Sequence, residues 1–294
     1  MNKIKSAFSW ILAIALSLGI ICSPAYAVED ESYEQEIENT AFNEPVSNSY
    51  IEIVESVLAE YGSDDQVSPQ WTSGSPDSGN PLTHGYITEV GINVVSNDHS
   101  NASSFYFAYA NSLIWGSVMP DFDENDSAYA WHFYGQNGKN YLFGDVTAYT
   151  KCIEHYNNAV QLYKSGYRYR SSAMEELGRA LHYLQDANVP HHVMNKIAVI
   201  TNHQEFEKEA EENRTSYVVT SMLSSAYPEY GKPLGKIIDY YANIARGWDS
   251  KACSSVQSDR AQAEGACIRN AQRATAAVLY KFMDDVSVVE LNLP

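Results

Sequence analysis

Residues 181–192 read LHYLQDANVPHH, and residues 203–207 read HQEFE. Because an α-helix completes a turn every 3.6 residues, side chains four positions apart share one face. In the first stretch, His182 and Asp186 have this spacing. In the second stretch, His203 and Glu207 have it. A single such pair is most often a packed or exposed histidine. Two pairs within about 25 residues predict a metal site that is built on two helices.

Helical periodicity recurs along the chain beyond residue 80, and strand patterns are almost absent. A stretch rich in glycine, proline and serine precedes the first expected helix, for which Thr83 is the expected N-cap. Helices of this length joined by short loops predict an all-α fold, a compact single-domain helical bundle. The expected helices cover residues 84–95, 102–115, 147–165, 171–187, 203–226, 234–246 and 260–286.

The first residues have the character of an export signal. A basic start at residues 1–5 is followed by an apolar run of about 15 residues and then by Ala25-Tyr26-Ala27. Such a run is too short to span a bilayer comfortably, so a membrane anchor is disfavoured. The sequence therefore predicts a cleaved signal peptide over residues 1–27 and a protein that is secreted to the extracellular space.

Residues 28–70 differ sharply in charge from the rest of the chain. They contain twelve aspartate and glutamate residues and no lysine or arginine. This composition is typical of a solvated, weakly folded segment, and we interpret it as an acidic propeptide. The remaining residues, 71–294, carry 25 acidic and 17 basic side chains. A domain with this excess of acid is a poor candidate for binding duplex nucleic acid through its phosphates.

Three cysteines remain after signal removal: Cys152, Cys253 and Cys267. An exported protein permits a disulfide between the last two, but the odd number argues against a full disulfide framework, and the pairing stays open. None of them stands in a Cys-x-x-Cys motif, so the metal ligands must be nitrogen and oxygen atoms. Histidine and carboxylate ligands without thiolates fit zinc best, and manganese or iron less well.

A second concentration of reactive side chains lies earlier in the chain. Residues 119–126 read MPDFDEND, and residues 129–134 read YAWHFY. A run of acids in a loop is usually solvated surface or, less often, a calcium site. This run leads within about ten residues into a histidine flanked by aromatic side chains. We therefore expect Asp121 and His132 to be buried and to join the helical metal ligands.

Together these motifs resemble the bacterial zinc-dependent phospholipase C family, in particular its single-domain, phosphatidylcholine-preferring members. The resemblance covers residues 71–294. Mature members begin with a tryptophan whose α-amine and carbonyl bind zinc, and Trp71, with His84 thirteen residues later, matches that start. The metal ligands that the resemblance implies are Trp71, His84, Asp121, His132, His182, Asp186, His192, His203 and Glu207.

The resemblance also implies a cluster of three zinc ions. One ion would be bound by Trp71, His84 and Asp186. Asp186 would also bind a second ion and so bridge the two. The other ligands of the second ion would be Asp121, His132 and His182, and those of the third His192, His203 and Glu207.

The activity implied by the resemblance is hydrolysis of the glycerol-side phosphodiester bond of a phospholipid by metal-activated water. The products would be diacylglycerol and a phosphorylated headgroup. Asp121 is the expected catalytic residue, because it would orient that water or accept its proton. Phe122 and Tyr129 occupy the positions of two aromatic side chains that hold choline in relatives preferring phosphatidylcholine. Gly74 stands where those relatives have an acid, which leaves the headgroup open.

Two other functions fit parts of the pattern. Fungal single-strand nucleases share a trinuclear zinc architecture, but they place the first histidine closer to the tryptophan and use aspartate where this chain has Glu207. A zinc-stabilised exported binding protein without turnover is the third reading. His99, His155 and His191 fall outside the ligand pattern, and we expect them to be surface or packing residues.

The position of Trp71 implies activation by proteolysis. A backbone nitrogen inside a peptide bond is a planar amide and a poor zinc ligand, whereas a free α-amine with a pKa near about 8 can lose its proton and bind. We therefore expect a protease to cut between Gln70 and Trp71. The partners expected are this protease and phospholipid at a membrane or micelle surface, with the protein itself a monomer.

Overall fold

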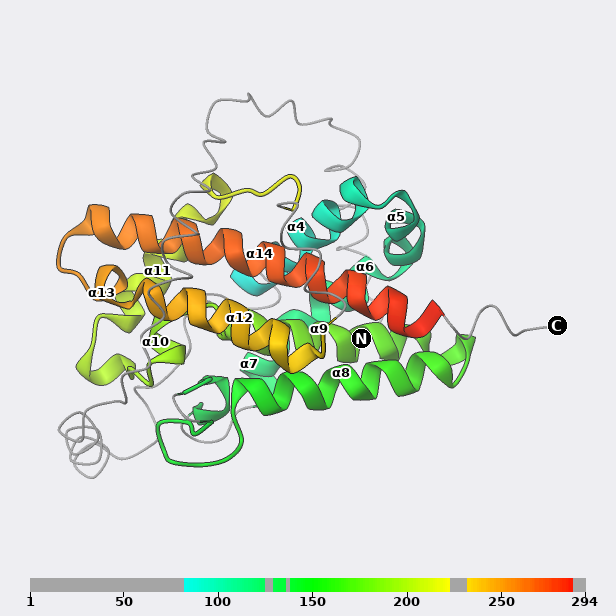
Figure 1. Ribbon diagram of the computed structural model, residues 1–294, viewed down its shortest axis with the longest axis horizontal. Helices are drawn as coiled ribbons and strands as arrows, with labels where there is room; N and C mark the ends of the chain where they lie inside the picture. The colour runs from blue at the N-terminus through cyan, green and yellow to red at the C-terminus, as the bar shows by residue number, and fades with distance from the viewer. Residues whose placement is uncertain (1–81, 125–128, 136–137, 223–231, 288–294) are drawn as a thin grey trace.

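The computed structural model describes residues 82–124, 129–135, 138–222 and 232–287 (Figure 1). The predicted signal peptide, the predicted propeptide and Trp71 lie outside these ranges. Within them the chain is helical and contains no strand. The prediction of an all-α fold is therefore confirmed.

The longer helices form the body of the bundle, and single turns join them. The longer helices are α4 (Thr83–Asp98), α5 (Ser100–Tyr106), α6 (Ala110–Val118), α8 (Ala148–Lys164), α9 (Arg170–Asp186), α11 (His203–Asn213), α12 (Leu234–Gly247) and α14 (Gln257–Ser287). The short helices are α7 (Pro120–Asp123), α10 (Pro190–Val193) and α13 (Asp249–Ala252). The 3₁₀ turns are η2 (Phe107–Tyr109), η3 (Ala130–His132), η4 (Tyr167–Tyr169), η5 (Ala198–Ile200) and η6 (Arg214–Ser216).

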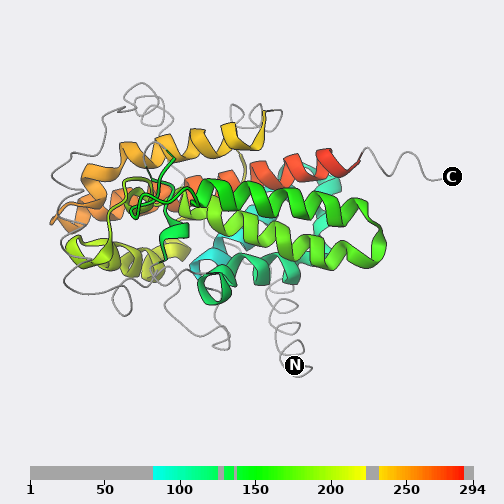
Figure 2. The same cartoon turned by 90° about the horizontal axis from the view of Figure 1, so that it is seen from below.

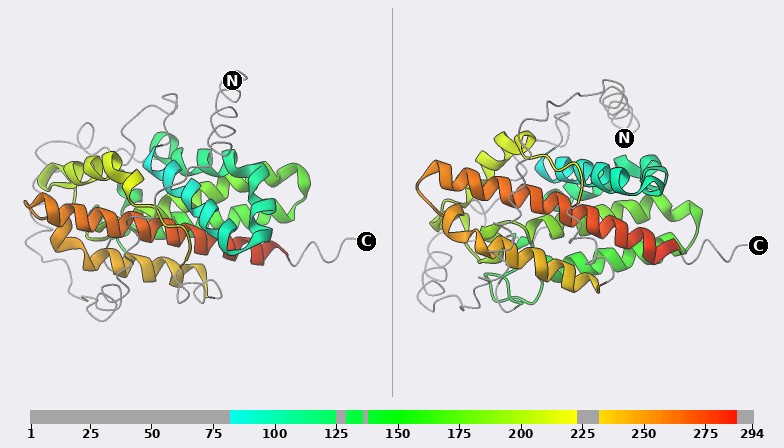
Figure 3. Two further views of the ribbon diagram at one scale, coloured as in Figure 1. Left: turned by 90° about the horizontal axis from the view of Figure 1, so that it is seen from above. Right: turned by 45° about the horizontal axis from the view of Figure 1, so that its top comes forward.

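The helix α9 is central to the arrangement. Helices α8 and α9 form an antiparallel hairpin, and α6 packs on another side of α9 (Figure 2). The long helix α14 runs beside α4 and also contacts α11 and α12 (Figure 3). Because α9 is enclosed by these neighbours, every residue from Ala180 to Asp186 is buried. A helix end that is buried on all sides must pair its polar side chains internally.

Two glycines set the close approach of α6 and α9. A Cβ atom on Gly116 would lie 2.1 Å from the carbonyl oxygen of Glu175, and one on Gly178 would lie 2.3 Å from that of Leu113. Any larger residue would push the two helices apart. The close contact also brings the end of α6 against His182, whose ring nitrogen Nδ1 lies 2.9 Å from the Ser117 carbonyl oxygen.

The expected helices differ from the observed ones in several places. Thr83 is the first residue of α4 and not its N-cap, which is Leu82 with an extended backbone; the Thr83 hydroxyl donates to Glu211. The expected helix over residues 102–115 is broken by η2, and the one over residues 203–226 ends at Asn213. The helix expected over residues 147–165 is observed as α8, where Thr147 is the N-cap and closes a capping box with Thr150.

The described residues contain neither a membrane-spanning helix nor a disulfide. No helix among them combines the length and the apolar character needed to cross a bilayer. Cys152, Cys253 and Cys267 are all free thiols, so the disulfide that the sequence left open between the last two does not form in this structure.

Candidate metal centre

Three groups of histidine and carboxylate side chains meet in the interior, in the region where α9 ends. Within each group the ligand atoms lie within 4.8 Å of one another. Two ligand atoms of a tetrahedral zinc ion are about 3.3 Å apart, since each Zn–N or Zn–O bond is about 2 Å long. Small side-chain movements therefore suffice for each group to share an ion. The groups are His84, His182 and Asp186; Asp121, His132 and His182; and His192, His203 and Glu207.

These side chains reach the centre from separate elements. His84 lies in the first turn of α4, Asp121 in the single turn α7, and His132 at the end of η3. The remaining members come from α9, α10 and α11. The acid-rich segment was expected to be a loop, but Pro120 begins a helical turn there, and that turn places the Asp121 side chain inside. All eight residues are buried.

The Asp186 carboxylate joins the groups because its two oxygens face different sides. Oδ2 lies 3.0 Å from His132 Nδ1 and 3.2 Å from His182 Nε2. Oδ1 lies 3.7 Å from His84 Nε2 and 3.3 Å from His192 Nδ1. A carboxylate in this position is suited to bridge two cations, which is the role that the resemblance implied for Asp186.

The orientation of two histidines is fixed by partners behind them. His84 Nδ1 lies 2.8 Å from Gln185 Oε1, and the Gln185 amide nitrogen donates to the hydroxyls of Thr88 and Thr275. His182 Nδ1 is held by a backbone carbonyl of α6. With Nδ1–H engaged as a donor, Nε2 of each ring is the atom directed at the centre, and it can bind a metal ion once it carries no proton. Sequence reasoning missed Gln185, since its partners lie 97 and 90 residues away.

The third group is more compact. His203 Nε2 lies 2.9 Å from Glu207 Oε1, one helical turn away on α11, and His192 Nε2 lies 3.2 Å from the same oxygen. These are ion-pair distances without the alignment of a hydrogen bond, and neither ring nitrogen of His203 has a hydrogen-bond partner among the described residues. One carboxylate oxygen close to the Nε2 atoms of two imidazoles is typical of ligands aimed at a common ion.

The charges of the centre shift several pKa values. Burial and the neighbouring His182 lower the pKa of His84 to about 4. Burial also opposes protonation of His182, but Asp186 and Asp121 outweigh it and raise its pKa to about 9. In the same way Asp186 and Glu207 raise the pKa of His192 to about 10 against the cost of burial. Without metal, these two imidazoles are therefore positively charged at neutral pH.

Zinc uptake is accordingly expected to tighten as the pH rises. A metal ligand must be a neutral imidazole, so zinc must displace the protons of His182 and His192, whose pKa values are about 9 and about 10. Each site that expels one proton should bind zinc about tenfold more tightly per pH unit between about pH 6 and about pH 8. Competition titrations with a chelator across this range measure the slope, and an affinity independent of pH would contradict the protonated histidines.

The same raised pKa values make the stability of the metal-free protein fall as the pH rises, whereas they make zinc affinity increase. In the metal-free folded protein the pKa values of His182 and His192 are raised above 6.5, the value in the unfolded chain. Protonation of these residues therefore contributes fully to the stability of the folded state below about pH 6.5. The contribution is lost as the pH rises through their folded-state pKa values, about 9 and about 10. Denaturant titration of the metal-free protein should therefore show falling stability above neutral pH.

The donor set fits zinc. It consists of imidazole nitrogens and carboxylate oxygens without a thiolate, and it includes buried ring nitrogens of His132 and His203 that have no hydrogen-bond partner among the described residues. The eight described members of the nine predicted ligands are thus brought together. Trp71, the ninth, lies outside the described residues.

The remaining candidate residues surround this centre. The Phe122 side chain follows Asp121 on α7 and is 42% exposed. The ring centroid of Tyr129 lies 6.0 Å from that of His132. His155 and His191 were expected to be surface or packing residues, and both are buried packing residues outside the three ligand groups; His191 stacks flat on His203 with ring centroids 4.9 Å apart.

Comparison with known proteins agrees with this geometry. Residues 83–260 match the family model described as zinc dependent phospholipase C. The chain is 28% identical over 235 residues to a phospholipase C of Paraclostridium bifermentans and 25% identical over 236 residues to one of Clostridium perfringens (strain 13 / Type A). These alignments cover 70% of this chain, which spans 59% of the length of the curated relatives.

Two alpha-toxins are among the solved structures that resemble this fold. The alpha toxin from Clostridium absonum superposes with a TM-score of 0.64 at 25% identity, over 70% of this chain and 64% of the toxin. The Clostridium perfringens alpha-toxin from avian strain SWCP superposes with a TM-score of 0.63 at 23% identity, over the same shares of the two chains.

Proposed function

This chain belongs to the zinc-dependent phospholipase C family, and on that premise we propose that it is a phosphoric diester hydrolase acting on phospholipids. The bond cleaved would be the phosphodiester on the glycerol side, which yields diacylglycerol and a phosphorylated headgroup. We further propose phosphatidylcholine as the substrate and a monomer working at a membrane or micelle surface.

The observation that carries the proposal is the continuity of the three ligand groups. His182 belongs to two of them, and the Asp186 carboxylate lies within 3.3 Å of His192 in the third. Isolated structural zinc sites are closed and separate, whereas adjoining sites suit a phosphodiester, whose attacking and leaving oxygens can each be stabilised by a metal ion. We propose three zinc ions in this centre, with Trp71 completing the ligand set.

Bound zinc would neutralise charge on the phosphodiester and lower the pKa of a water molecule. The chain's own residues supply the rest. Asp121 Oδ1 lies 3.6 Å from His132 Nδ1 and 3.5 Å from His182 Nε2, so its carboxylate is held at the edge of the centre. We propose that Asp121 orients the attacking water or accepts its proton, as a positioned general base.

The headgroup preference is proposed from two aromatic side chains. Phe122 is directly after Asp121, and Tyr129 contacts His132. Aromatic faces attract quaternary ammonium ions by about 0.5 to 2 kcal/mol. The two rings would therefore favour choline over a headgroup without a quaternary ammonium. The family's acid is replaced by Gly74, which lies outside the described residues.

Export and activation complete the proposal. Residues 1–27 would direct secretion, and removal of residues 28–70 would free the Trp71 amine to bind zinc. We expect protein that retains residues 28–70 to bind fewer zinc ions and to be largely inactive, and limited proteolysis to restore both. Zinc content and hydrolysis rate, measured before and after cleavage with N-terminal sequencing of the product, decide this. Equal activity in the uncut form would refute activation while leaving the family assignment intact.

The proposed substrate is tested by a side-by-side assay. Processed protein is given phosphatidylcholine micelles, phosphatidylethanolamine micelles and single-stranded DNA under the same conditions. Release of diacylglycerol, fastest from phosphatidylcholine, supports the proposal. Cleavage of DNA alone would assign the centre to a nuclease, and no turnover of any substrate would leave a zinc-stabilised binding protein.

A further inference from the structure

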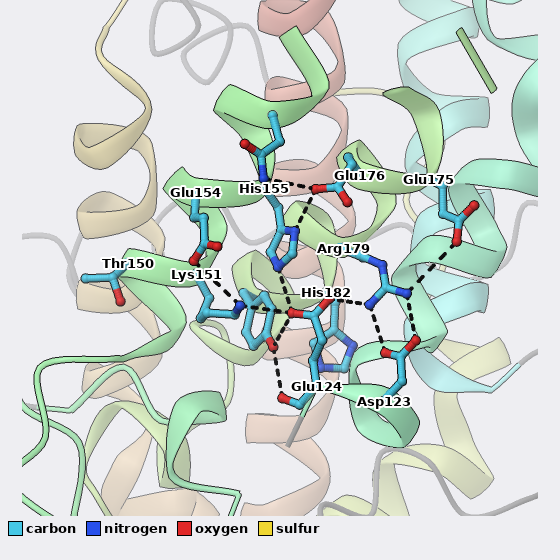
Figure 4. Close-up of polar contacts among 12 residues, drawn as sticks. Asp123, Glu124, Thr150, Lys151, Glu154, His155, Glu175, Glu176, Arg179 and His182 are labelled. Atoms are coloured by element: carbon cyan, nitrogen blue, oxygen red, sulfur yellow. Dashed lines mark hydrogen bonds and ion pairs between the residues drawn. The ribbon is translucent and has the colours of Figure 1, made fainter. Parts of the chain in front are cut away.

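A second polar cluster lies beside the metal centre, among α7, α8 and α9 (Figure 4). Its middle is the Glu124 carboxylate, which directly follows α7 and whose side chain is 17% exposed. We call the group the Glu124 cluster. Its members are Asp123, Glu124, Lys151, His155, Glu176 and Arg179.

Donors from two helices converge on Glu124. From α8, His155 Nε2 lies 2.8 Å and Lys151 Nζ 3.0 Å from its Oε2 atom. From α9, the Arg179 guanidinium donates to Oε1, and the Tyr183 hydroxyl lies 3.4 Å from Oε2. Burial opposes ionisation of this carboxyl, but His155 and Lys151 hold its pKa well below the usual value. Glu124 is therefore a charged anchor between α7, α8 and α9.

Arg179 ties the same turn to α9 a second time. Its two terminal nitrogens donate to the two oxygens of Asp123, at 2.8 and 2.7 Å. Such a two-pronged pair fixes direction as well as distance. Arg179 stands three residues before the ligand His182 on α9. The helix that carries His182 thus also holds the turn that carries Asp121.

His155 completes the charge balance of the cluster. It lies between two carboxylates, with Nε2 on Glu124 and Nδ1 2.9 Å from Glu176. Its ring also stacks on Tyr183, with centroids 5.8 Å apart, and the Tyr183 ring contacts the ligand His132 at 5.4 Å. The cluster is thereby packed against the metal centre through an aromatic side chain, without supplying a ligand itself.

The turn needs such an anchor because it is short. Helix α7 has four residues, and its backbone bonds are those from Phe122 and Asp123 to Met119 and from Glu124 to Pro120. A single helical turn is not stable by itself in water. Its position must therefore come from tertiary contacts, and the Glu124 cluster supplies charged ones at its C-terminal end.

We propose that Glu124 is a positioning residue, which holds the α7 turn against α8 and α9 and thereby keeps the Asp121 carboxylate in register with His132 and His182. The inference rests on the proposed function, since it assigns Asp121 the catalytic role. It adds that this role depends on a carboxylate three residues away that is not a metal ligand.

The test is Glu124→Gln, which keeps the size of the side chain and removes its charge. We expect kcat for phosphatidylcholine to fall by about tenfold with KM within about twofold, since a catalytic group is displaced and substrate binding is not. Amide hydrogen exchange at residues 122–124 should become about tenfold faster, and exchange in α14 should not change. Arg179→Lys, which keeps the charge and loses the two-pronged geometry, should give a smaller change of the same kind.

The matched control is Asp285→Asn. This carboxylate also accepts from a tyrosine hydroxyl, Tyr156 at 2.8 Å, and from a lysine, Lys281 at 3.2 Å, near the far end of α14. Its variant should lose stability comparably and keep both kcat and the exchange rates of residues 122–124. If both variants lower kcat equally, or if Glu124→Gln leaves kcat and local exchange unchanged, the positioning role is wrong.

The positioning role of Glu124 can still be tested if the Glu124→Gln variant does not fold or if the wild-type protein does not hydrolyse phospholipid. Should Glu124→Gln not fold, His155→Phe keeps an aromatic ring beside Tyr183, removes the donor to Glu124 and should show the same pattern at smaller size. Should the wild-type protein not hydrolyse phospholipid, the proposed function fails. The exchange rates of residues 122–124 still decide whether Glu124 positions the turn.

Discussion

Removal of zinc is expected to abolish phospholipid hydrolysis and to lower the thermal unfolding midpoint by more than about 10 °C. The ligand side chains come from separate elements that include α4, α9 and α11, so metal binding contributes directly to folding. Without metal, His182 and His192 keep their protons in a buried site. The loss of helical circular dichroism on heating, with and without a chelator, measures the effect together with the hydrolysis rate.

Return of zinc should restore both activity and stability. A magnesium or calcium control distinguishes specific metal binding from general screening, because nitrogen-rich sites bind these ions poorly. If the chelated protein kept its activity and its unfolding midpoint, the interpretation of the buried histidines and carboxylates as a metal centre would be wrong.

Asp121→Asn is expected to lower turnover by at least about 100-fold while the fold persists. The substitution keeps the size of the side chain and removes the negative charge and the proton acceptor. The residue is nearly buried, at 8% exposure, so the loss would not be compensated by solvent. Steady-state rates with phosphatidylcholine, and the circular dichroism spectrum of the variant, measure both parts of the prediction.

The matched control is Asp145→Asn, which makes the same chemical change at an exposed carboxylate that pairs with Lys139. Surface ion pairs of this kind contribute little to stability, so the control should behave as wild type. Native turnover in Asp121→Asn would show that the catalytic assignment is wrong.

The sequence predicted the helical parts of the centre well. His182 with Asp186, and His203 with Glu207, have a spacing that only a helix turns into one face, and the structure places each pair in a helix. The longest helix was also expected within three residues of its observed ends. Long periodic segments are predictable because burial of one face and local propensity favour the same structure.

The short elements were not predictable in the same way. The turn α7 has too few residues to show periodicity, and its acids are as typical of a solvated loop as of a helix. The expected helix after residue 203 was too long, because the run from Tyr217 to Thr220 contains β-branched residues that disfavour helix. The turn α7 is held in place by contacts with α8 and α9, and a local sequence pattern does not show such long-range contacts.

The roles of the polar residues that contact the metal ligands from behind also could not be predicted from local sequence. Gln185 stands next to the predicted ligand Asp186, yet its role follows from Thr88 and Thr275, which the fold brings from other helices. His155 was expected to be a surface or packing residue; it is packed in the interior, and the sequence did not show that it also links Glu124 and Glu176. Their roles depend on which side chains surround them, and this becomes known only once the helices are packed.

The zinc content of processed, active protein tests the trinuclear centre most directly. Protein cleaved before Trp71 is purified without added metal, its hydrolysis of phosphatidylcholine is measured, and zinc per chain is determined by elemental analysis on the same sample. We expect about three zinc ions per active chain, one for each of the three ligand groups. One ion, or none, in fully active protein would contradict the trinuclear centre.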